Sequence, residues 1–287
     1  MFNANGMTSI YSYFKVRVLF SSVLTLALVS CLSSEKSVTA ENLLDNARKL
    51  EKNDPQAALL TLDSIHETFP RDIKSRRLAD TIEWRIELAQ AIITLPHVDS
   101  MLRTDSARLE ELKVNFNYSP ISDYQDIGTW EHRYFRTENN THRNYLKPTV
   151  NDNGDIVLIS FYVGRESMHT SMTVSIDGME RQSEVADDIS SFIDNGVFHE
   201  FLSFNDNLTN GMVAYIADTE GEEVIITLNG DNPYSYEMLD RDREAFRETM
   251  SLAVLLREIH DFATQQHKFS RQIDLLNQRL NNEVKND

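Results

Sequence analysis

Apolar residues in the last long stretch of the chain repeat with alternating spacings of three and four. The repeat is carried by Leu252, Leu255, Ile259, Phe262, Phe269, Ile273, Leu276 and Leu280, and the polar Gln266 interrupts it once. Such a repeat keeps one stripe of a helix against a partner helix. The pattern therefore predicts a long helix whose apolar seam is covered by a second helix.

A matching repeat lies far upstream. Its apolar residues recur every seven positions, at Leu88, Leu95, Leu102, Leu109 and Phe116. We expect residues 73–116, the first arm, and residues 241–284, the second arm, to form one antiparallel, coiled-coil-like pair. Exposure of either apolar seam to water would be unfavourable. The alternative is a homodimer in which the arms of two chains pair.

Two residues modify this picture of the arms. Proline inside a helix removes a hydrogen bond and clashes with the preceding turn, so we expect the first arm to be kinked or split at Pro96. Antiparallel pairing places Gln266 opposite this break. Gln266 then either fixes the register of the pair or points into solvent where the seam opens.

Residues 40–68 have the pattern of two short amphipathic helices separated by Asn-Asp-Pro. Asp54 is expected to cap the second helix, and Pro55 suits its first turn. Together with the first arm, these helices make residues 40–116 a helical region.

The segment 117–240 has a different period. Strand-like runs rich in β-branched and aromatic residues occur at 156–163, 172–176, 197–204, 212–217 and 224–228. Most are bounded by dipeptides such as Asn-Gly and Asp-Gly, which favour tight hairpin turns. Residues 130–135 are expected to add an edge strand. The fold class is thus α+β, with an antiparallel sheet or small sandwich inserted between the arms.

The first thirty residues have the layout of a secretory signal. Lys15 and Arg17 precede an uncharged apolar run at 18–29, which is too short to span a bilayer. The run ends in Leu-Val-Ser-Cys at 28–31, which resembles the lipobox of bacterial lipoproteins, and Cys31 is the single cysteine. The resemblance implies cleavage after residue 30, lipidation of Cys31, and residues 31–39 as a tether.

The charge of the chain narrows the choice of partners. Removal of residues 1–30 takes away two basic residues and no acidic one, so the net charge changes from −17 to −19. Such a surface repels nucleic acid and anionic lipid. Attachment to a membrane would therefore depend on the lipid anchor.

The second half of the chain carries further motifs. These are Tyr-Leu-Lys-Pro at 145–148, Gly-Asp-Ile-Val-Leu-Ile-Ser at 154–160, His-Thr-Ser at 169–171, and the start of the last helix at 239–255. They resemble a recurring pattern in uncharacterised envelope lipoproteins of Bacteroidetes. The resemblance implies a location in the cell envelope, at the outer membrane or cell surface rather than the inner membrane. It also implies an architecture of helices that flank a β domain. It implies no mechanism.

Few residues carry candidate chemistry. Asp152 and Asp155 lie in a segment that resembles the start of a calcium loop, but the downstream carboxylate of such loops is missing and a hairpin turn explains the same residues. His169 is interpreted as a hydrogen-bonded structural residue or, alternatively, as a ligand-facing one. No catalytic, metal-binding or cofactor-binding motif is found.

Four short sequences resemble the acceptor motif for O-glycosylation in envelope proteins of the same bacteria. Their acceptor residues are Ser64, Thr81, Ser100 and Ser106. Asp-Ser pairs also arise at helix turns, so three-residue matches are weak signals.

The sequence is therefore interpreted as a lipid-anchored, non-catalytic binding or scaffolding module, with a protein or glycan of the envelope as its partner. The alternative is a hydrolase with a carboxylate or His169 at a site in the β domain.

Overall fold

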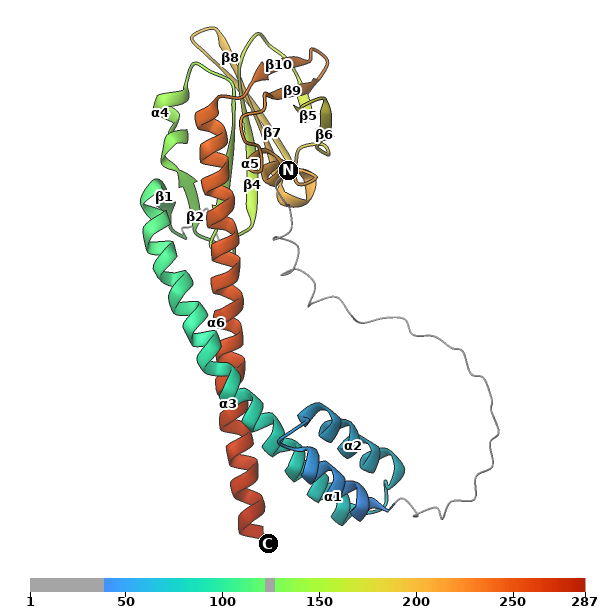
Figure 1. Cartoon of the computed structure of the whole chain (residues 1–287). Coiled ribbons are helices and arrows are strands. Elements are labelled where there is room, and N and C mark those ends of the chain that lie inside the picture. Colours follow the sequence, from blue (N-terminus) through green and yellow to red (C-terminus); the bar gives the residue numbers. More distant parts are fainter. Residues whose placement is uncertain (1–38, 122–126, 287) are drawn as a thin grey trace, which may run out of the picture.

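The helical hairpin precedes two much longer helices. The computed structural model describes residues 39–121 and 127–286 (Figure 1). Helices α1 (Ala40–Leu50) and α2 (Pro55–Thr68) pack on each other and on the start of α3 (Ile73–Leu112). As expected, the Asp54 carboxylate accepts a hydrogen bond from the backbone N–H of Ala57. None of the helices in the described ranges is long and apolar enough to cross a membrane.

The helix α6 (Asp240–Asn286) runs antiparallel to α3 (Figure 1). Arg77 of α3 contacts Glu283 of α6 at 2.7 Å, and Asp99 accepts a hydrogen bond from Gln266 at 2.8 Å. Near the β domain, Asn115 donates to Glu248. Gln266 therefore points across the pair to a polar partner, about one turn beyond the position opposite Pro96.

The first arm was expected to be kinked or split at Pro96; the split is wrong, because α3 continues through this residue. The Pro96 side chain lies on the exposed side of the helix, whereas Ala91 and Val98 on either side of it are buried. Burial of these neighbours offsets the hydrogen bond that proline cannot donate.

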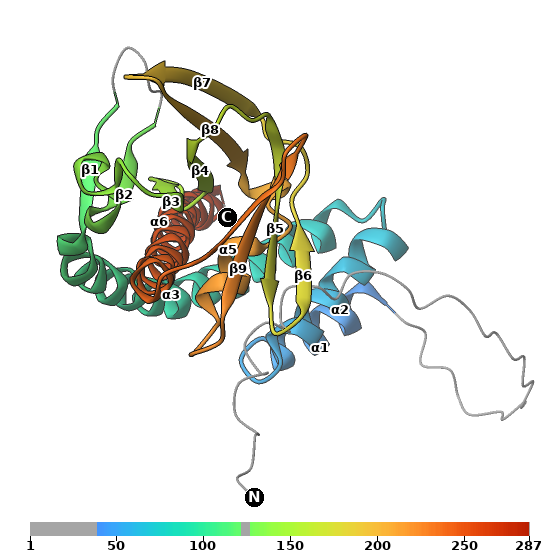
Figure 2. The ribbon, with the colours of Figure 1, turned by 90° about the horizontal axis from the view of Figure 1, so that it is seen from above.

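The β domain contains two antiparallel sheets. The larger one has the order β1-β2-β3-β4-β8-β7. Its strands, in that order, are Phe116–Ser119, Thr129–His132, Tyr145–Asn151, Ile156–Gly164, Val197–Asn205 and Asp188–Asp194. The sheet curls, so that β7 and β8 turn back above β3 and β4 (Figure 2).

The smaller sheet has the order β10-β9-β5-β6. Its strands, in that order, are Tyr234–Glu237, Val224–Gly230, His169–Ile176 and Met179–Gln182. The buried residues of both sheets and the first half of α6 form one hydrophobic core, which includes Phe246 and Leu252. The short helix α4 (Thr137–Asn140) precedes β3 at the rim of the larger sheet.

Two expectations for this domain are wrong. Residues 212–217 form a helix, α5 (Met212–Ala217), that packs on α6. Gly211 enters it with φ +73°, and Met212, Val213 and Ile216 are buried at helical spacing. The run at 130–135 forms a strand only as far as His132, within β2, and this strand is not at the edge: β2 is paired on both sides, and Arg133–Phe135 form a 3₁₀ turn.

Candidate functional site

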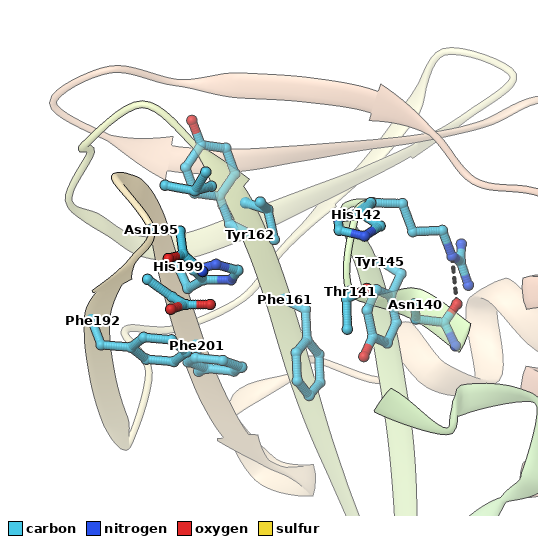
Figure 3. Close-up of a pocket in the computed structure, with 14 residues that line it drawn as sticks. Asn140, Thr141, His142, Tyr145, Phe161, Tyr162, Phe192, Asn195, His199 and Phe201 are labelled. Atoms are coloured by element: carbon cyan, nitrogen blue, oxygen red, sulfur yellow. Dashed lines mark hydrogen bonds between the residues drawn. The ribbon is translucent and has the colours of Figure 1, made fainter. Parts of the chain in front are cut away.

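An aromatic pocket lies across strands β3, β4, β7 and β8 of the larger sheet (Figure 3). It has a volume of about 330 Å³. Strands β3, β4, β7 and β8 contribute the rings of Tyr145, Phe161, Phe192 and Phe201, and Tyr162 of β4 and His199 of β8 also line the pocket. The register makes these side chains neighbours, since Tyr145 pairs with Phe161 and Phe161 pairs with Phe201.

The rings divide into two walls. Tyr145 and Phe161 are stacked, with centroids 4.5 Å apart and planes within 4°. Phe192 and Phe201 are stacked at 5.6 Å, while Phe161 and Phe201 meet edge to face at 84°. An apolar or ring-shaped group can thus enter between walls that meet at a right angle (Figure 3).

The cationic side chains near the pocket already have acidic partners. Arg143 forms two hydrogen bonds of 2.7 Å with Asp242, whose side chain is 1% exposed. Lys147 lies 3.3 Å from Glu131, and its ammonium group sits over the Phe161 ring. The pocket therefore has no free cation among its described residues that would recognise an anionic ligand.

The polar rim is made of amide, hydroxyl, imidazole and carboxylate groups, which belong to Asn140, Thr141, His142, Asp194, Asn195 and His199. Burial raises the pKa of the Tyr145 phenol well above its usual value, so this hydroxyl stays protonated. Burial also raises the pKa of Tyr162, whose hydroxyl donates to the Arg165 carbonyl. The rim can form hydrogen bonds with a neutral ligand and can attract a positive one.

His169 lies in a different place, at the contact between the two sheets. Its Nδ1 is 2.5 Å from the Glu200 carboxylate, which also accepts the His169 backbone N–H at 3.1 Å. Both side chains are 0% exposed. On the other side of the ring, Nε2 is 3.1 Å from the Asn232 carbonyl and 3.2 Å from the Ser167 hydroxyl.

Ser167, His169 and Glu200 have the connectivity of a serine–histidine–acid triad but not its chemistry. The Ser167 hydroxyl donates to the Asn232 carbonyl, so its proton points away from the imidazole. Both ring nitrogens of His169 face oxygen acceptors: Nδ1 faces the Glu200 carboxylate and Nε2 faces the Asn232 carbonyl. A base needs a free lone pair toward the nucleophile. We interpret the group as a buried link between the sheets.

The other predicted site residues do not join His169. Asp152 accepts hydrogen bonds of 2.9 Å from Tyr118 and from Trp130, and Asp155 is exposed and bonded to Asn151. These aspartates lie in the β3–β4 turn, at the opposite end of β4 from the loop that leads to His169. Gly154, with φ +83°, completes the turn and abuts α6.

The predicted acceptor residues for glycosylation lie on helices. Ser64 is on α2 and Thr81 on α3, and both hydroxyls donate to the backbone carbonyl four residues earlier. Ser100 and Ser106 are exposed on α3. Cys31 and the signal segment lie outside the residues described.

One group of potential metal ligands joins α2 to α3. His66, Asp80 and Glu83 place one ligand atom each within 4.8 Å of one another. However, Arg76 donates to His66 Nδ1 at 3.3 Å, which leaves the proton on Nε2, directed at Asp80. The imidazole is thereby already satisfied by protein groups.

No protein-family model, curated protein or solved structure matches this chain.

Proposed function

We propose that this protein is a non-catalytic binding module of the cell envelope whose ligand enters the aromatic pocket. The observation that carries the proposal is the pair of stacked ring walls across four strands. A largely preformed apolar pocket with a few polar groups is the usual form of a binding site. The hydrolase alternative lacks such support, because the buried histidine faces acceptors on both sides.

The architecture supports a display role. We propose that the paired helices α3 and α6 form a coiled-coil-like stalk and that the two sheets form a sandwich-like head. The hairpin α1–α2 and the head lie at opposite ends of the stalk (Figure 1). Since α6 has 47 residues, the stalk would hold the pocket on the order of 70 Å from its far end at 1.5 Å per residue.

We propose further that Cys31 carries the lipid anchor, as the lipobox resemblance implies. Replacement of Cys31 by alanine is expected to move the protein from the membrane fraction to the soluble fraction. Retention in the membrane with unchanged migration would contradict the anchor. The pocket proposal does not depend on this result.

The pocket is tested by capture from the native envelope. The wild-type protein, the Phe161→Ala variant and the Phe262→Ala variant serve as baits; Phe262 is a half-buried phenylalanine on α6, outside the pocket. We expect ligands retained by the wild type and Phe262→Ala to be lost with Phe161→Ala. Equal retention by all three baits would refute the pocket as the binding site, provided that circular dichroism shows each variant folded.

A further inference from the structure

Strand β7 (Asp188–Asp194) is an edge strand with an open side. It pairs only with β8 on one side, and no strand of the described ranges pairs with the other. All seven residues are exposed, including the apolar Ile189, Phe192 and Ile193, which are 37%, 51% and 66% exposed. Natural proteins usually shorten, twist or cover such an edge, because it is a template for another strand.

The hairpin turn defines which backbone groups face the open side. Asp194 and Val197 flank the two-residue turn formed by Asn195 and Gly196, both with positive φ. The pair beside such a turn is hydrogen-bonded, and bonded pairs alternate along the strand. The N–H and C=O groups of Ile189, Ser191 and Ile193 are therefore turned away from β8.

The charges around β7 discriminate between partners. A second copy of β7 that paired Ile189 with Ile193 would place Asp188 opposite Asp194 at both ends. Like charges directly opposite are destabilising, and a net charge of −17 adds to the repulsion. A strand with basic residues at these two positions instead gains two favourable cross-strand pairs.

We infer that β7 binds an extended segment of a partner polypeptide by strand addition, with Lys or Arg opposite Asp188 and Asp194 and apolar residues between them. This inference deepens the proposed binding function and rests on it. Phe192 belongs to both surfaces: it lines the aromatic pocket from β7, so a side chain of the added strand opposite Phe192 extends that pocket. Backbone hydrogen bonds supply affinity in this mode, and side chains supply specificity.

The test uses a synthetic heptapeptide that runs antiparallel to β7. It has lysine at both ends, valine opposite Ile189, Phe192 and Ile193, and threonine opposite Ser190 and Ser191. Binding is measured by fluorescence anisotropy. We expect the peptide to bind, and a version with glutamate at both ends to bind at least tenfold more weakly. Equal affinity of the two versions, or no binding of either, would overturn the inference.

Backbone methylation tests the mode of binding. Methylating the peptide amides opposite Ile189, Ser191 and Ile193 should abolish binding, because these amides face β7. Methylating those opposite Ser190 and Phe192 should preserve it. Equal effects of both methylations would contradict strand addition.

A protein variant completes the experiment. Ser191→Pro removes an outward N–H without removing a bond to β8, and proline is tolerated on edge strands. We expect it to weaken peptide binding at least tenfold, whereas Ser191→Ala binds like the wild type. If Ser191→Pro binds the peptide normally, the inference fails. If envelope ligands still depend on Phe161 in that case, the proposed function stands without it.

Discussion

The His169 imidazole and the Glu200 carboxylate lie 2.5 Å apart with both side chains fully buried. His169 is the first residue of β5 in the smaller sheet, and Glu200 is in the middle of β8 in the larger one. The pair therefore joins the two sheets by charge-assisted hydrogen bonds within an apolar core.

Loss of one member of this pair should strongly destabilise the fold. In Glu200→Ala, the buried His169 side chain and backbone N–H lose their acceptor, and we expect a cost of about 3–5 kcal/mol in the free energy of unfolding. Urea denaturation measures the change. The double variant His169→Leu with Glu200→Leu removes both polar groups and should cost less than Glu200→Ala alone. A larger cost for the double variant would contradict the link between the sheets.

Gly154 should be sensitive to any side chain. A Cβ at this position would lie 2.5 Å from the Ala253 carbonyl oxygen of α6, and φ is +83°. Gly178 is a matched control, because its φ is +75° but nothing lies within 4 Å of an added Cβ. We expect Gly178→Ala to cost about 1–2 kcal/mol from backbone strain and Gly154→Ala to cost more. Equal losses in thermal denaturation would show that the turn does not pack on α6.

Pro96 is expected to weaken α3. Replacing it by alanine restores a backbone N–H in the helix interior and should stabilise the protein by up to about 3 kcal/mol. Ser100→Ala, at an exposed position of the same helix, should change stability by less than about 1 kcal/mol. Chemical denaturation compares the two variants. A destabilised Pro96→Ala would mean that the pair of helices requires the distortion that proline introduces.

Glu83 makes stability depend on pH. Burial, followed by the nearby Glu87 and Asp63, raises the pKa of its carboxyl above 4.5. The folded state thus holds this proton more tightly than the unfolded state, so ionised Glu83 destabilises the fold at neutral pH; the penalty shrinks as pH falls through the raised pKa and is gone below 4.5. Glu83→Gln should raise the melting temperature at pH 7 and lose this advantage at low pH. Glu67→Gln, at an exposed position on α2, is the matched control, and an equal response of both variants to pH would contradict the role of Glu83.

The α+β class and the antiparallel strands could be predicted from local pattern. The Asn195-Gly196 turn is an example, because this dipeptide accepts positive φ at both positions and the structure shows it there. Residues 212–217 form a helix although their pattern also fits a strand. A short apolar run fits a strand and a buried helix equally well, and its contact with α6, which decides the matter, is distant in sequence.

The candidate site could not be predicted from the sequence, for a different reason. Phe161 and Phe201 are forty residues apart and meet only through the register of β4 and β8. Alternation along β4 signals that neighbouring side chains face opposite sides of the sheet, but it does not identify the side that carries the pocket. Likewise, the sequence could not identify which of the many acidic residues is the partner of His169. Glu200 lies in the larger sheet and His169 in the smaller one, and the two residues meet only where the sheets pack together.

The antiparallel pairing of α3 and α6 also determines how the protein carries a pulling force. The polypeptide connects the α1–α2 hairpin to the β domain through α3, while α6 returns beside it and ends near the hairpin (Figure 1). A force that pulls the β domain away from the hairpin is therefore borne along the α3 backbone, and it loads the contacts between α3 and α6 in shear. Contacts such as Arg77 with Glu283 and Asp99 with Gln266 then share the load together instead of opening one after another. α6 is covalently joined to the β domain, so it takes up part of the tension through these contacts and also stiffens the connection against bending.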